Sequence, residues 1–150
     1  METTSLPSQS PRRKRPVAVL IAFGIAGVAA IGYLTSHTGD YNLTLALAAK
    51  AENLSYPKMV DEETRIDSVT ASSDLVYHYY YSFPNMATED VSNESFCADW
   101  EAVVLENLKK VGQSKEFGKH GVTLMFTMRD KTGAHLCTVT LAPERYYQGQ

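Results

Sequence analysis

Histidines, serines and carboxylates are the side chains of this 150-residue sequence that could do chemistry. The four histidines show no spacing typical of a metal site, such as two on one face of a helix; they are His37, His78, His120 and His135. No serine stands in a Gly-x-Ser-x-Gly turn, and none has an assignable base. We therefore predict that the protein is not an enzyme and has no catalytic residue, metal site or cofactor.

Two acidic segments are the remaining chemical candidates. Residues 130–133 (DKTG) resemble the phosphorylated-aspartate motif of P-type ATPases over four letters, but Ala134 stands where those enzymes have a threonine. A hairpin turn explains this segment, because Asp can bond to the backbone of a turn and Gly allows a positive φ. The adjacent Asp61, Glu62 and Glu63 cannot all face one site, so we interpret them as a solvated charge run and as candidate partner contacts.

The two cysteines of the chain, Cys97 and Cys137, form the one possible pair. We place both outside the cytoplasm, where an oxidising environment favours an intrachain disulfide. The bond would close a loop of about 40 residues, which stabilises a fold by roughly 3–4 kcal/mol in the chain-entropy estimate. Two buried free thiols are the alternative. Strand alternation puts His135 on the same side of its strand as Cys137.

An uncharged run of eighteen residues, Val17 to Leu34, follows the basic cluster Arg12, Arg13, Lys14 and Arg15. Roughly 18–20 apolar residues cross the hydrocarbon core of a bilayer as a helix. Residues 35–40 contain no Lys or Arg, so the positive-inside rule places the N-terminus in the cytoplasm. We predict a single-pass inner-membrane protein with a disordered basic cytoplasmic tail (1–16), a transmembrane helix in contact with lipid (17–34) and a periplasmic domain (35–150).

The same run could instead be a cleaved secretory signal, since it has a basic start, an apolar centre and small residues. Its length favours an uncleaved anchor. Small residues recur along it at every fourth position and could let a second helix approach closely, which predicts self-association through Ala18, Ala22, Ala26 and Ala30. The general abundance of Ala and Gly in membrane helices is the other explanation of this pattern.

Charge is divided unevenly between the tail and the domain. Of the chain's 14 basic and 17 acidic residues, the tail holds Arg12, Arg13, Lys14, Arg15 and Glu2, so the tail is +3 and residues 35–150 are −6. Such a domain has no basic surface with which to neutralise phosphates, which excludes nucleic acid as a partner. Its length suffices for one small domain.

Hydrophobic periodicity divides the domain into two helices and four strands. Asp40 is a candidate N-cap for a helix over 41–54, and a second helix over 95–111 ends at Gly112. Alternation predicts strands over residues 64–70, 75–83, 121–129 and 134–141. The order α-β-β-α-β-β predicts an α+β fold: one four-stranded antiparallel sheet with both helices packed on one face.

The strand over 75–83 (LVYHYYYSF) is the strongest in the sequence. Its alternation puts Tyr77, Tyr79 and Tyr81 on one face, which we interpret as core. Tyr80 points the opposite way, and tyrosine is enriched in protein interfaces because it offers a large contact area. Tyr80 is therefore the first candidate for an exposed partner contact.

Residues 54–83, followed by Cys97 and the hairpin GVTLMFTMRDKTGAHLC, resemble small single-pass bacterial envelope proteins with a periplasmic αββαββ domain. The shared pattern is a Pro, a Val-Asp-x-x-Thr-Arg-x-x-Ser-Val strand, a Tyr-rich strand, a Cys and a Gly-bounded hairpin. The resemblance implies a bacterial periplasmic setting and carries no catalytic residue.

Together these features predict a membrane-anchored periplasmic binding or accessory protein of the bacterial cell envelope, which acts through contacts with another envelope protein. The alternative is an immunity or inhibitor protein that neutralises a toxin or hydrolase in the periplasm, because a −6 domain suits a basic partner. An envelope hydrolase whose site the sequence does not reveal is a third reading.

Overall fold

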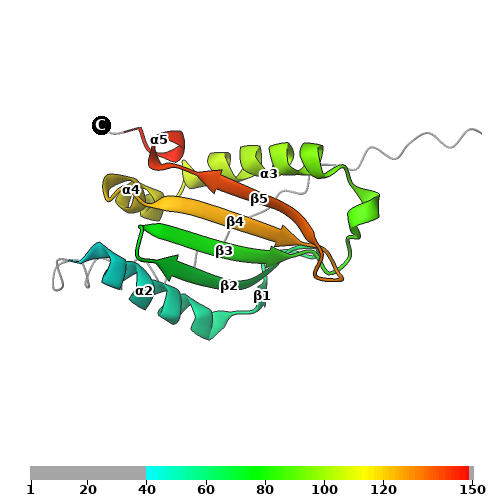
Figure 1. The fold of residues 1–150 in the computed structure, drawn as a ribbon, viewed down its shortest axis with the longest axis horizontal. Helices are drawn as coiled ribbons and strands as arrows, with labels where there is room; N and C mark the ends of the chain where they lie inside the picture. Colours follow the sequence, from blue (N-terminus) through cyan, green and yellow to red (C-terminus); the bar gives the residue numbers. More distant parts are fainter. Residues whose placement is uncertain (1–39, 149–150) are drawn as a thin grey trace, which may run out of the picture.

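A computed structural model describes residues 40–148, and residues 1–39 and 149–150 lie outside the described part. Its main feature is a five-stranded sheet in the order β1-β2-β3-β4-β5, with helices packed along it (Figure 1). In chain order the elements are α2 (Tyr41–Glu52), η1 (Asn53–Ser55), β1 (Lys58–Met59), β2 (Arg65–Ser72), β3 (Val76–Ser82), η2 (Thr88–Asp90), α3 (Asn93–Leu108), α4 (Gly112–Lys119), β4 (Thr123–Arg129), β5 (His135–Leu141) and α5 (Pro143–Tyr146).

The sheet is mixed, so the predicted four-stranded antiparallel sheet is wrong. β2 and β3 form an antiparallel hairpin, as do β4 and β5, but the central strands β3 and β4 run parallel. Between these two strands the chain passes through α3 and α4. A helical crossover returns the chain to the end of the sheet at which the previous strand began, so neighbouring strands joined in this way are parallel.

A fifth strand, β1, extends the sheet beyond β2. It consists of Lys58 and Met59, which pair with Ile66 and Arg65. The sequence predicts only an interruption of the chain here, because Pro57 breaks the preceding helix and a two-residue strand has no alternation to detect.

The helix ends follow from local chemistry. Asp40 caps α2, since its Oδ1 accepts a hydrogen bond from the Asn42 N–H at 2.9 Å. α3 ends at Leu108, earlier than predicted, and Gly112 begins α4 instead of ending α3. The sequence predicts a connector where α4 lies, because a helix of 8 residues is too short to give a clear period.

The helices pack on one side of the sheet, which we call the covered face. Tyr77, Tyr79 and Tyr81 of β3 lie there and are at most 1% exposed. The Tyr79 ring stacks on Phe126 of β4, and Tyr81 meets Trp100 of α3 edge-on, each with ring centroids 5.5 Å apart. Every helix of the described chain except the two 3-10 turns adds to this core, with Leu45, Ala48, Trp100, Val104, Leu108, Phe117 and Tyr146. Burial of such large aromatic area is the main stabilising contribution in a domain of this size.

No helix of residues 40–148 is long and apolar enough to cross a membrane. The longest, α3, has 16 residues and spans about 24 Å, short of the roughly 30 Å hydrocarbon core, and it carries acidic side chains throughout. The predicted single-pass inner-membrane localisation thus finds no support in the described chain and is not retained. The predicted tail (1–16), the predicted span (17–34), the basic cluster at 12–15 and the stripe Ala18, Ala22, Ala26 and Ala30 lie outside the described residues.

Candidate binding face

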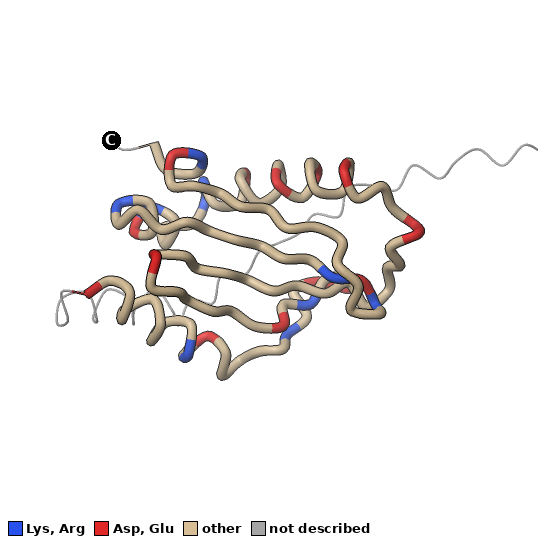
Figure 2. Tube along the Cα trace, in the orientation of Figure 1, with Lys and Arg blue, Asp and Glu red and all other residues tan. Residues whose placement is uncertain are grey.

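The second face of the sheet, which we call the open face, carries no helix from the described part of the chain. Its side chains alternate with those of the covered face. In the central rows all but Thr127 are half-buried or exposed; they are Ser68, Thr70, Val76, His78, Tyr80, Thr123, Met125, Thr127, Thr138 and Thr140. None of these is an acid, a lysine or an arginine, but one end of the face carries Arg65 and Arg129, both paired with Ser82, and Asp67, whose Oδ1 accepts from the Ser82 hydroxyl at 3.1 Å. Figure 2 shows the charged residues gathered on helices, on loops and at the strand ends instead.

A chain of hydrogen bonds crosses the open face from β3 to β5. His78 Nε2 lies 2.8 Å from Thr127 Oγ1, which lies 3.0 Å from Thr138 Oγ1. His135 Nε2 completes the chain at 2.9 Å from Thr138 Oγ1. The structure therefore links His78 and His135 through two threonine hydroxyls.

A β-bulge brings His135 onto the open face. The register shifts between Met128 and Arg129, so that Met128 pairs with Cys137 while Arg129 pairs with His135. Leu136 is the extra residue, and one extra residue reverses the alternation of side chains beyond it. The prediction that His135 shares a side with Cys137 is wrong for this reason.

His78 is a neutral partner for the hydroxyls around it. Partial burial lowers the pKa of its imidazole below the ordinary 6.5, and its ring stacks on Tyr80 with centroids 4.1 Å apart. Thr127 is only 7% exposed and its hydroxyl is already bonded to Thr138. The His78–Thr127 pair thus links β3 to β4 across the open face.

The predicted contact residues lie in two places. Tyr80 is half-buried in the middle row of the open face, between Ser68 and Thr127. Glu62 and Glu63 are exposed in the turn between β1 and β2. Asp61 has a structural task in that turn, because its Oδ1 accepts hydrogen bonds from the N–H groups of Glu63 at 2.8 Å and of Thr64 at 2.7 Å.

A disulfide joins Cys97 in the first turns of α3 to Cys137 of β5, with Cα atoms 5.7 Å apart. Cys137 is 1% exposed and points into the covered face. The bond therefore fixes α3 to the last strand of the sheet.

The sequence analysis missed a buried carboxyl group at the end of α2. Glu52 is 5% exposed; its Oε1 accepts from the Tyr77 hydroxyl at 3.1 Å and its Oε2 from the Tyr56 hydroxyl at 3.2 Å. Burial raises the pKa of Glu52, while hydrogen bonds from Tyr77 and Tyr56 lower it in part. Glu52 thus joins α2 to β3. A glutamate in an otherwise alanine-rich helical run gives no sequence signal of such a site.

Asp130 builds the β4–β5 turn, as a turn aspartate should. Its Oδ1 accepts from the N–H groups of Thr132 at 2.7 Å and Ala134 at 2.9 Å, and its Oδ2 accepts from the Thr88 hydroxyl at 2.7 Å. Hydrogen bonds from the Thr132 and Thr88 side chains hold the pKa of this carboxyl well below its usual range. With both oxygens occupied, Asp130 has none left for a phosphoryl group.

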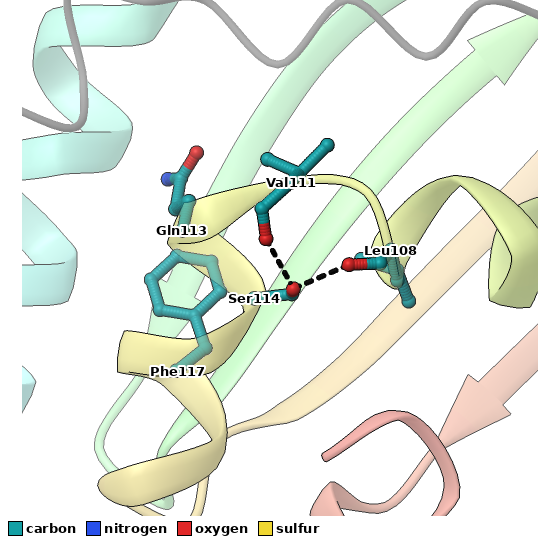
Figure 3. Close-up of a pocket in the computed structure, with 5 residues that line it drawn as sticks. All are labelled: Leu108, Val111, Gln113, Ser114 and Phe117. Carbon is teal, nitrogen blue, oxygen red and sulfur yellow. Dashed lines mark hydrogen bonds between the residues drawn. The ribbon is translucent and has the colours of Figure 1, made fainter.

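A small depression lies where α3 turns into α4 (Figure 3). Leu108, Val111, Phe117 and the aliphatic part of Gln113 line it, and the Ser114 hydroxyl lies 2.5 Å from the carbonyl oxygens of both Leu108 and Val111. It has no room even for a water molecule, so it is a packing feature of the helix junction. Within residues 40–148 no three His, Cys, Asp or Glu side chains are grouped so as to hold a metal ion.

Comparison with known proteins identifies the family of the chain. Residues 42–137 match the model of a family described as a domain of unknown function (DUF8479), and the chain belongs to that family. No curated protein matches the sequence.

Three solved structures share the fold. A candidate secreted protein from Pseudomonas aeruginosa (PA3611) is 14% identical, with a TM-score of 0.58 over 72% of this chain and 96% of that one. The pilotin EpsS of the Vibrio vulnificus type 2 secretion system is 8% identical, with a TM-score of 0.58 over 72% and 93%. The type II secretion system pilotin AspS from Vibrio cholerae is 12% identical, with a TM-score of 0.55 over 76% and 99%. At these identities the likeness is one of fold.

Proposed function

We propose that the domain is a partner-binding accessory module of the bacterial cell envelope, which holds another envelope protein against its open face. The observation that carries the proposal is the open face itself. Four strands wide and free of charged side chains in its central rows, it carries no helix from residues 40–148 and has Tyr80 in its middle row. A sheet of this kind is commonly covered on both sides in larger assemblies, and an uncovered face with an aromatic centre suits a protein partner.

The side chains of the face suit this role. Tyr80, Met125 and Val76 offer apolar contact area, while the threonine hydroxyls around them can donate and accept hydrogen bonds. The chain from His78 through Thr127 and Thr138 holds the centre of the face in one conformation. A surface fixed before binding loses less conformational entropy on association.

Glu62 and Glu63 extend the proposed surface at the rim. Their turn lies near the end of β3, because the Asn85 amide reaches the Glu62 carbonyl oxygen at 3.5 Å. Exposed rim charges of this kind speed association with an oppositely charged partner more than they tighten the complex.

Three further findings support an accessory role in the envelope. The folds compared above include two pilotins of type II secretion systems, and the proposal takes its class of function from them. The Cys97–Cys137 disulfide fits an oxidising compartment. The histidine–hydroxyl pairs among the described residues are joined to each other through Thr127 and Thr138, an arrangement that favours a binding role.

Site-specific photo-crosslinking in intact cells tests the proposal. With a photoreactive residue at position 80 of the full chain, we expect one dominant adduct that mass spectrometry can identify. The Tyr80→Ala variant should then bind that partner more weakly by roughly 1–2 kcal/mol, the cost of losing one central aromatic contact. Its melting temperature should stay close to that of the unmodified protein, since Tyr80 is only half-buried.

Leu54→Ala is the matched control, because Leu54 is 88% exposed on η1, away from the open face. It should leave capture unchanged. The proposal fails if Tyr80→Ala captures the partner as well as Leu54→Ala does, or if a photoreactive residue at position 54 yields the same adduct as one at position 80.

A further inference from the structure

The two edges of the sheet are protected very differently. At the β2 edge, the Asn53 side chain clamps the backbone of Val69: its Nδ2 donates to the Val69 carbonyl at 2.7 Å and its Oδ1 accepts from the Val69 N–H at 2.8 Å. The two-residue strand β1 covers the rest of that edge, and it brings Lys58 with it. Short strands, lysines and side-chain clamps are the means by which proteins block pairing at an edge.

The other edge is β5, and the direction of its backbone groups can be derived. Thr123 N–H donates to Leu75 O at 2.8 Å, and Arg129 O accepts from Phe83 N–H at 2.9 Å. Odd-numbered backbone groups of β4 therefore point toward β3, and even-numbered ones point toward β5.

Register then assigns the groups of β5. Leu124, Phe126 and Met128 lie opposite Leu141, Val139 and Cys137, whose backbone groups point inward. The N–H and C=O groups of Thr138 and Thr140 consequently point away from the sheet. Among residues 40–148, no backbone hydrogen bond outside the strand ladders reaches either threonine.

Two of the usual protections are present only in part: a bulge lies at the start of the strand, and α3 packs beside it. The strand HLCTVTL contains no proline, lysine or acidic residue, and only the bulge at its start departs from regular geometry. From Thr138 onward the strand is regular, and alternating side chains are buried and exposed. An edge left in this state is a template for a further strand.

We infer that the free edge of β5 accepts an extended segment of a partner protein, which adds to the sheet as a further strand at Thr138 and Thr140. The inference rests on the proposed partner-binding function and names a mode of binding for it. Thr138 and Thr140 also belong to the open face, so a segment on this edge would extend that surface without a break. Main-chain hydrogen bonds would supply the attraction, and alternate apolar side chains would face the α3 side.

The charge beside β5 specifies the partner further. From η2 through α3 the chain has six acidic residues and no basic one: Glu89, Asp90, Glu94, Asp99, Glu101 and Glu106. Glu101 and Glu106 are paired with Arg145 and Lys110, which leaves four without an ion-pair partner among residues 40–148. The disulfide holds this helix next to β5. Figure 2 shows its acidic positions spaced along α3. A segment flanked by lysine or arginine would be attracted, whereas a second copy of the chain would place two acidic helices near each other across the new pairing.

A labelled synthetic peptide with alternating Val and Thr between paired lysines tests the inference against the full chain by fluorescence polarisation. We expect saturable binding that weakens as salt rises. A peptide of the same sequence with alternate backbone N-methylation cannot pair, and it should bind at least about tenfold more weakly, the equivalent of one lost hydrogen bond. A glutamate-flanked peptide should also bind more weakly.

Amide exchange followed by NMR locates the contact. The Thr138 and Thr140 amides should exchange fast in the free protein and slow down when the lysine-flanked peptide is added. The Val139 amide, which points inward, should be protected in both states. A general stabilisation of the fold would slow exchange at all three amides, so slowing confined to Thr138 and Thr140 indicates strand addition.

Thr140→Pro removes the outward N–H and should reduce peptide binding about tenfold, because proline is tolerated at outward positions of an edge strand. Thr140→Ala keeps the N–H and should bind as the unmodified protein does.

The inference is overturned if the N-methylated peptide binds equally well, if no lysine-flanked peptide binds, or if the protein forms a dimer that Thr140→Pro dissociates. If the inference is overturned while Thr140→Pro still crosslinks at position 80, the proposed function stands without the inference. If peptide binding is intact and the position-80 adduct is lost, only the proposed function is rejected.

Discussion

Glu52 is an ionisable group enclosed between a helix and a sheet. Tyr77 and Tyr56 donate to its two carboxylate oxygens, and the same proximity raises the pKa of Tyr77, chiefly through burial and then through the charge of Glu52. Because the folded state raises the pKa of Glu52, it favours the protonated acid. The contribution of Glu52 to stability is therefore fully present below its unfolded pKa of about 4.3 and is lost as pH rises through its folded pKa.

We expect the free energy of unfolding to gain from this group as pH falls through the raised pKa of folded Glu52 toward its unfolded pKa. Glu52→Gln keeps the shape of the side chain but cannot ionise, so the variant should lack this part of the pH dependence. Urea denaturation of both proteins at matched pH values measures the difference, which cancels the titration of all other groups.

Tyr77→Phe provides the matched control. It removes the hydroxyl that donates to Oε1 and should cost about 1 kcal/mol at neutral pH, since it leaves a buried carboxylate with one donor fewer. It should also move the pH window upward, because Glu52 becomes easier to protonate. Parallel pH profiles for the unmodified protein and Glu52→Gln would contradict this account.

The residue scale shows both what sequence periodicity can predict and where it stops. Alternation in β3 separates Tyr80 from the buried Tyr77 and Tyr79, because side-chain direction in a strand is a local property. Glu52 meets Tyr77 across 25 positions of the chain, and nothing local distinguishes it from an exposed glutamate. His135 is displaced by a bulge, and a one-residue insertion in a ladder leaves no mark in a pattern of period two.

At the scale of elements, the central parallel pair β3–β4 determines the architecture. Each strand of that pair also belongs to a hairpin, and both hairpins could be predicted from alternation and the intervening turns. How two hairpins meet depends on the path of the helices between them, which periodicity does not encode. The α3 crossover carries Cys97 back toward β5, where the disulfide closes the unit.

The disulfide predicts a measurable loss when it is removed. Cys97 and Cys137 are 40 residues apart, and opening a loop of that length costs roughly 3–4 kcal/mol in the chain-entropy estimate. The double variant Cys97→Ser/Cys137→Ser should lose about that much free energy of unfolding in urea. The unmodified protein in reductant should converge on the same value, and identical midpoints with and without reductant would show that the thiols are not joined.

At the scale of the whole molecule, helices pack on the covered face of the sheet, and no helix of residues 40–148 packs on the open face. α2 lies along the β2 side of the sheet and α3 along the β5 side, and both fill the covered face (Figure 1). The open face and the β5 edge are adjacent, whereas the β2 edge is closed by Asn53 and β1. The groups free to meet a partner are therefore gathered toward β5 and the middle of the open face.

This arrangement predicts an order of local stability that amide exchange by mass spectrometry can measure. β3 and β4 have a strand on each side and carry Tyr79 and Phe126, which are at most 1% exposed. The backbone amides of these two strands should therefore exchange most slowly. β1, with two exposed residues, and the short α5 should exchange fastest. Reduction of the disulfide should speed exchange in α3 and β5 more than in β2, because only the former pair is tied by it. If α3 and β2 respond equally to reduction, the domain opens as one cooperative unit and the disulfide acts on the unfolded chain alone.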